Sequence, residues 1–66
     1  MKVLLRSTQT GHYFQRPQGW TSDSNAALDF GHIEQAIKTA CEAQLEHVEV
    51  VFSFGQPERD LQLPIR

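Results

Sequence analysis

The chain has few of the devices that usually stabilise a small domain. Cys41 is the only cysteine among 66 residues, so no intramolecular disulfide can form, and a thiolate-rich structural zinc site is excluded. A chain of this length buries only about 60% of the surface that its unfolded form exposes. We therefore expect stability to come from an apolar core, with self-association as a further source.

The sequence also lacks an excess of basic charge and any long apolar run. Six basic and eight acidic residues give a formal net charge of −2, which is not the pattern of a polyanion-binding protein, so nucleic acid is an unlikely partner on charge alone. Arg6 ends the opening apolar run well short of a signal peptide, and no run approaches the roughly 20 residues of a membrane span. We expect a soluble protein, and the lone thiol fits the reducing cytoplasm.

The most informative feature present is a change of hydrophobic period between residues 33 and 54. Apolar residues first recur every three or four positions and then every second position. This change predicts an amphipathic helix followed directly by a half-buried strand. The helical set is Ile33, Ala36, Ile37, Ala40, Cys41 and Leu45, and the strand set is Val48, Val50, Phe52 and Phe54.

Turn residues divide the N-terminal half. Lys2 to Thr8 is predicted to be a first strand, and the turn Gln9-Thr10-Gly11 leads into a return strand from His12 to Arg16. Pro17 and Gly19 mark another turn. Residues 26 to 30 fit either a short strand or the tail of a turn.

The C-terminal half contains the predicted helix and two strands. The helix is expected to begin at Gly31 or His32, with Gly31 as its N-cap, and to end near Leu45 or Glu46. Residues 48 to 54 form a strand in the sheet interior. After a turn, residues 61 to 65 form a last antiparallel strand, and Pro64 suits a sheet edge.

These elements predict a single α+β domain spanning residues 1 to 66. A mainly antiparallel, four-stranded sheet carries one helix on one face, in the chain order strand, strand, short strand or turn, helix, strand, strand.

Catalytic and metal-binding chemistry is not indicated. His12, His32 and His47 lie near predicted element ends, and no two of them are three or four residues apart, as paired ligands on a helix commonly are. Cys41 is expected in the core as part of the apolar helical stripe, and Glu49 is expected on a solvated face. We therefore predict no catalytic residue, no metal ion, no cofactor and no enzymatic activity.

Partner binding is the remaining function class. Tyr13 and Phe14 should face opposite sides of the sheet, and Trp20 either anchors a partner or closes one end of the core. Leu4 and Val51 are predicted on the face away from the helix, where they would form an apolar patch in water. The candidate partner-binding residues are Leu4, Arg6, Tyr13, Arg16, Trp20 and Val51.

Two function hypotheses follow. The first is a non-enzymatic protein-interaction module that forms a homodimer through the bare sheet face or edge, or that binds another protein. The alternative is a small nucleic-acid-binding domain in which Arg6 and Arg16 contact phosphates while Tyr13 or Trp20 stacks on bases. The net charge of −2 disfavours the alternative.

Four segments carry a resemblance to a known group of proteins. They contain Trp-Thr-Ser-Asp, Ala-Leu-Asp-Phe, Ala-Ile and Val-Glu-Val-Val, and their matching positions are Trp20, Asp29, Phe30, Ala36, Ile37, Val48, Glu49, Val50 and Val51. In these positions the chain resembles small uncharacterised bacterial proteins of about this length. The resemblance covers most of the chain and implies a fold, but no reaction.

Overall fold

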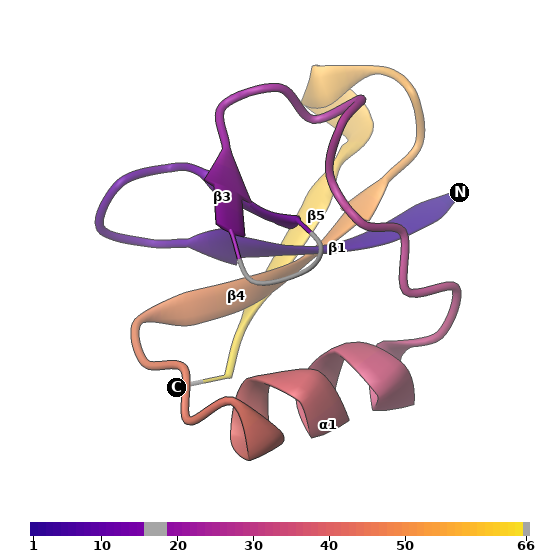
Figure 1. Ribbon diagram of the computed structural model, residues 1–66. Helices are drawn as coiled ribbons and strands as arrows, with labels where there is room; N and C mark the ends of the chain where they lie inside the picture. The colour runs from indigo at the N-terminus through magenta and orange to yellow at the C-terminus, as the bar shows by residue number, and fades with distance from the viewer. Residues whose placement is uncertain (16–18, 66) are drawn as a thin grey trace.

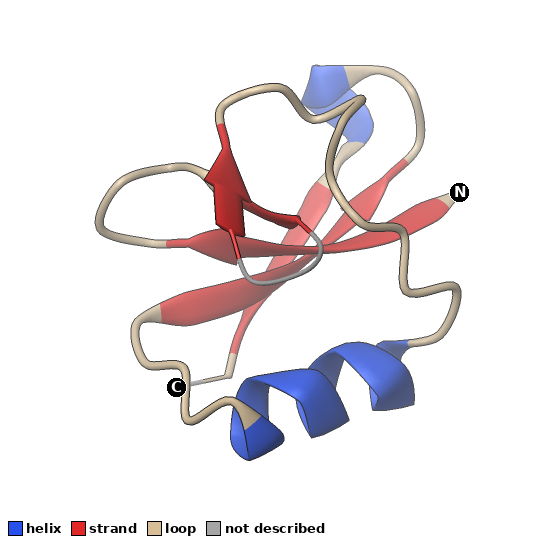
Figure 2. Cartoon of the chain, in the orientation of Figure 1, coloured by secondary structure: helices blue, strands red, loops and turns tan. Residues whose placement is uncertain are grey.

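The computed structural model describes residues 1–15 and 19–65. An antiparallel five-stranded sheet carries one helix, α1, on one face (Figures 1 and 2). The strand order is β3-β2-β1-β4-β5. The elements are β1 (Lys2–Ser7), β2 (Tyr13–Gln15), β3 (Gly19–Thr21), α1 (Ile33–Glu42), β4 (Val48–Ser53), the short 3-10 helix η1 (Pro57–Arg59) and β5 (Leu61–Pro64).

The predicted α+β class is confirmed, but the sheet has five strands where the sequence predicted four. The additional strand is β3, which pairs with β2 and places Trp20 opposite Phe14. Of the two alternatives for residues 26 to 30, the short strand is wrong and the tail of a turn agrees with the structure. This segment runs beside the sheet as a loop, where Leu28 donates its N–H to the Phe14 carbonyl (3.0 Å) and Phe30 to the Val3 carbonyl (2.8 Å).

The centre of the sheet is the β1–β4 pair. The two strands are in register over six residue pairs, from Lys2 opposite Ser53 to Ser7 opposite Val48. The interior position predicted for residues 48 to 54 is confirmed, because β4 lies between β1 and β5. The core joins β1, β2, β4 and α1, and its buried members are Val3, Leu5, Phe14, Ala36, Ala40, Val48 and Val50.

The helix is shorter at both ends than the sequence predicted. Its N-cap is His32 with extended backbone, not Gly31, which precedes it with a φ of 81°. It ends at Glu42 because Gln44 enters the left-handed region at a φ of 54°. The Leu45 N–H then bonds to the Ala40 carbonyl (2.9 Å), which closes a Schellman motif without the usual glycine.

The buried stripe of α1 is narrower than the apolar pattern predicted. Ala36 and Ala40 are fully buried, whereas Ile37 is 37% exposed. Cys41 is exposed, so its predicted place in the core is wrong. At about 100° of rotation per residue, Cys41 lies about 120° around the helix axis from the midpoint of the two alanines, which is on the solvent side.

One helix cannot cover five strands. An α-helix is about 10 Å wide, and neighbouring strands are about 4.8 Å apart, so a single helix covers roughly two strands. In this protein α1 packs mainly on β1 and β4, and β3 and β5 lie at the two edges of the sheet (Figure 1). Apolar side chains on the helix-facing side of those edges therefore remain accessible.

Candidate interaction surface

Leu4 and Val51 lie directly opposite each other on the sheet face away from α1. The prediction that they form an apolar patch in water is wrong, because each is only 1% exposed. Their neighbours on this face, two residues along the same strands, are Lys2, Arg6, Glu49 and Ser53. Polar residues therefore flank the pair along both strands, and because both side chains are buried no bare apolar centre is left for docking.

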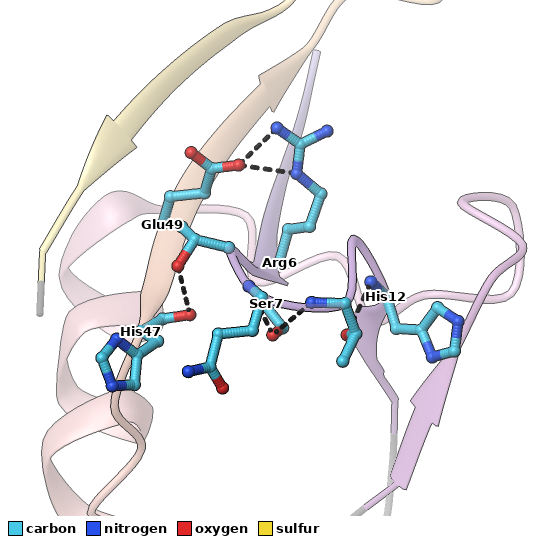
Figure 3. Close-up of polar contacts among 8 residues, drawn as sticks. Arg6, Ser7, His12, His47 and Glu49 are labelled. Atoms are coloured by element: carbon cyan, nitrogen blue, oxygen red, sulfur yellow. Dashed lines mark hydrogen bonds and ion pairs between the residues drawn. The ribbon is translucent and has the colours of Figure 1, made fainter.

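Arg6 and Glu49 form an ion pair beside this buried pair. The Arg6 Nε donates a hydrogen bond of 2.6 Å to Glu49 Oε2, and one terminal guanidinium nitrogen contacts the same oxygen (Figure 3). Glu49 is 8% exposed, so its predicted place on a solvated face is wrong. The two residues are opposite each other in the β1–β4 ladder, which brings their side chains together.

Tyr13 completes this polar cluster from β2. Its register with Arg6 puts both side chains on the same face, and the guanidinium carbon lies 6.0 Å from the ring centroid. Burial tends to lower the pKa of Arg6, but its interactions with Glu49 and Tyr13 raise that pKa overall. The guanidinium is thus held as a cation and already has two partners within the protein.

Phe14 and Trp20 lie on the helix-facing side of the sheet, opposite to Tyr13. The predicted division of Tyr13 and Phe14 between the two faces is confirmed, since Phe14 is in the core. Trp20 packs edge-on against Phe14 with ring centroids 5.7 Å apart, yet it remains 40% exposed. Trp20 therefore closes the core at the β3 edge while keeping part of its ring accessible. Arg16 lies outside the described residues.

The most exposed apolar side chains of the sheet are on β5, at the opposite edge. Leu61 is 61% exposed and Leu63 is 45% exposed. Both face the helix side, because they are in register with Phe52 and Val50. The sequence predicted this last antiparallel strand correctly, but it did not indicate that both leucines would be exposed. The signal that could have identified them is the single helix, which is too narrow to reach an outer strand.

The backbone of β5 also has an open side. Ile65 donates its N–H to the Val48 carbonyl, so the backbone groups of Ile65 point toward β4. In an antiparallel ladder the backbone groups of successive residues point alternately toward the partner strand and away from it. Leu61 and Leu63 therefore direct their backbone groups to β4, while Gln62 and Pro64 direct theirs outward. Within the part of the chain that the structure describes, no strand pairs with this outer side. Pro64 fits there because it has no N–H to leave unpaired.

Other surface features offer less. A depression of about 340 Å³ is lined by exposed and half-buried residues from the N-terminus, from the ends of β1 and β4 and from nearby loops, namely Met1, Lys2, Ser24, Asn25, Ser53, Phe54, Gly55 and Asp60. Among residues 1–15 and 19–65, no three His, Cys, Asp or Glu side chains gather as a metal site would require.

The three histidines are exposed and lie at the ends of elements, as the sequence indicated. His32 caps α1. The His47 carbonyl accepts hydrogen bonds from the Thr8 N–H (2.7 Å) and from the Thr8 Oγ1 (3.0 Å; Figure 3). The His12 carbonyl accepts one from the Ser7 N–H (2.8 Å). All of these bonds use backbone carbonyls, so they place the chain without assigning a role to the imidazoles.

Comparisons with protein-family models, with curated proteins and with solved structures gave no match. The resemblance to small bacterial proteins therefore stays a prediction. In the described ranges, no helix combines the length and the apolar character that crossing a membrane requires.

Proposed function

We propose that this protein is a small, non-enzymatic interaction module that self-associates through the outer edge of β5. The observation that carries the proposal is the combination, on one short strand, of two exposed leucines and an open backbone side. The leucines supply apolar area to bury, and the backbone groups of Gln62 supply hydrogen bonds with a defined direction.

The composition of this edge supports the proposal. Edge strands in proteins that stay monomeric are commonly protected by short length, by charged side chains or proline, by bulges or by a covering segment. Of these devices β5 has a short length of four residues and one proline. Residues 61 to 65 contain no charged side chain, and Pro64 is the only residue of this edge that reduces its pairing capacity. An uncharged edge with two exposed leucines is suited to strand addition.

The sheet face offers less support than the edge. Leu4 and Val51 are buried within the monomer, so the version of self-association that used them as a bare face is not retained. The nucleic-acid alternative also loses support, because Arg6 is engaged by Glu49 and Tyr13. The single thiol, on Cys41, fits a reducing compartment, and we expect the protein to act in the cytoplasm.

Sedimentation equilibrium over micromolar to millimolar concentration tests the proposal. An interface between two short edges belongs to the weak class, which buries less than about 1,200 Å². We expect reversible dimers whose association constant falls at least tenfold in Leu61→Lys, because a lysine there would place a charge in the apolar contact.

Trp20→Thr is the matched control, since it removes an exposed aromatic side chain from the opposite edge. It should leave the association constant within about twofold of the wild type. A wild-type chain that stays monomeric at millimolar concentration, or a dimer lost in Trp20→Thr and kept in Leu61→Lys, would contradict the proposal.

A further inference from the structure

We infer that the occupant of the β5 edge is a second copy of this chain, paired antiparallel about a two-fold axis at Gln62, so that two five-stranded sheets join into one. This inference rests on the proposed function and adds the pairing register to it. Its starting point is the alternation of the β4–β5 ladder, which turns the backbone groups of Gln62 outward.

The backbone groups determine which register is favourable. With the axis at Gln62, each Gln62 N–H donates to the Gln62 carbonyl of the other copy, forming a hydrogen-bonded pair. Pro64 then lies opposite Asp60 of the second copy, where the missing proline N–H removes one of the two bonds of that pair. An axis at Pro64 would leave the central pair without any donor, so that register is disfavoured.

Side-chain pairing favours the same register. With the axis at Gln62, Leu61 lies opposite Leu63 of the second copy, and Leu63 opposite Leu61, in the non-hydrogen-bonded positions where side chains approach most closely. The four exposed leucines would then bury one another on the helix-facing side. On the other face the two Gln62 amides are neighbours and can exchange hydrogen bonds.

Charge is compatible with this arrangement. Asp60 is the acidic residue that precedes β5. The two-fold axis at Gln62 places it opposite Pro64 of the second copy rather than opposite Asp60 of the second copy. An axis at Asp60 would put two carboxylates face to face, which is unfavourable. In the register centred on Gln62 the edge is therefore self-complementary in hydrogen bonds, apolar contacts and charge.

Disulfide trapping in a Cys41→Ser background tests the register. Gln62→Cys places two thiols on residues whose Cα atoms are about 5.5 Å apart, within disulfide reach. Asp60→Cys is the control, because its two copies are offset by four residues along the strands, about 13 Å. We expect Gln62→Cys to form the covalent dimer at least tenfold faster than Asp60→Cys under mild oxidation.

A second variant tests the backbone bonds. Gln62→Pro removes an outward N–H and leaves the β4–β5 ladder intact, so we expect an unchanged melting temperature and at least a tenfold loss of association. Equal trapping rates for the two cysteine variants, or undiminished association in Gln62→Pro, would overturn the register. If either result is found while Leu61→Lys still dissociates the dimer, the register is wrong but the proposed self-association through β5 stands. A wild-type chain that stays monomeric would contradict both.

Discussion

Leu63 lies directly opposite Val50 in the β4–β5 ladder, on the same face of the sheet, yet Leu63 is 45% exposed and Val50 is completely buried. One strand spacing separates them. The difference arises because α1 packs mainly on β1 and β4, and a helix about 10 Å wide does not extend over the next strand. The apolar alternation of β5 thus continues the core pattern beyond the area that the monomer buries.

This contrast predicts unequal costs for truncating the two residues. Val50→Ala should lower the free energy of unfolding by about 2 kcal/mol, because it removes fully buried methyl groups. Leu63→Thr, at an exposed position that threonine tolerates in a strand, should change it by no more than about 0.5 kcal/mol when measured on the monomer. Urea denaturation at low micromolar concentration measures both. Equal losses would show that Leu63 belongs to the monomer core.

Leu4 should be a structural residue, although it lies on the face away from the helix. Because the side chain is 1% exposed, Leu4→Ala is expected to cost about 2 to 5 kcal/mol of unfolding free energy. Lys2→Ala is the control on the same strand and face, where an exposed side chain should change stability by less than about 0.5 kcal/mol. A Leu4→Ala variant as stable as wild type would mean that this face is open after all.

The end of the helix offers a stabilising substitution. Gln44 adopts a φ of 54°, a conformation that costs an L-residue about 1 kcal/mol and glycine almost nothing. We expect Gln44→Gly to raise the free energy of unfolding by about 0.5 to 1 kcal/mol.

Ala43→Gly is the matched comparison, because Ala43 has a φ of −87° and gains nothing from glycine. It should lower stability, since glycine adds freedom to the unfolded chain. Thermal unfolding of both variants distinguishes the two effects, and a destabilised Gln44→Gly would contradict the strain assigned to this position.

Asp29 should make stability depend on pH in the acid range. Its carboxylate accepts the backbone N–H groups of Val3 and Gly31, each at 3.0 Å, and these bonds lower the pKa of Asp29 below its ordinary value of 3.8. A group with a lowered folded-state pKa contributes its full stabilisation above the unfolded-state pKa, and that contribution is lost as the pH falls through the folded-state value.

Asp29→Asn keeps an acceptor oxygen but cannot titrate. We expect the variant to show a weaker loss of stability than wild type as the pH falls below about 4. Urea midpoints measured at several pH values between about 2 and 6 test this. Parallel profiles for the two proteins would show that the Asp29 hydrogen bonds do not contribute to acid unfolding.

The sequence predicted the parts of the fold that depend on local periodicity. The period change between residues 33 and 54 identified α1 and β4, and the alternation of Leu61, Leu63 and Ile65 identified β5. The three residues of β3 are too few to show a period, so the sequence indicated only a turn at Gly19 and no strand at Gly19–Thr21. Its strand character depends on the tertiary pairing of Trp20 with Phe14.

The candidate surface was harder to predict because burial depends on what covers each face. Alternation correctly placed Leu4 and Val51 away from the helix, but it could not show that both side chains would be buried in the folded monomer. Glu49 was assigned to solvent because a lone carboxylate prefers water, and its partner Arg6 is 43 positions away in the sequence. The leucines of β5 resembled core residues because their pattern is the same as that of β4.

The most direct test of the central claim is amide hydrogen exchange at Gln62, measured by NMR as a function of protein concentration. We predict that the Gln62 N–H exchanges quickly in dilute solution and becomes protected as the protein associates. The Leu63 N–H, which points to β4, should be protected at every concentration in the folded protein. A Gln62 amide that remains unprotected up to millimolar concentration, while Leu63 stays protected, would contradict self-association through the β5 edge.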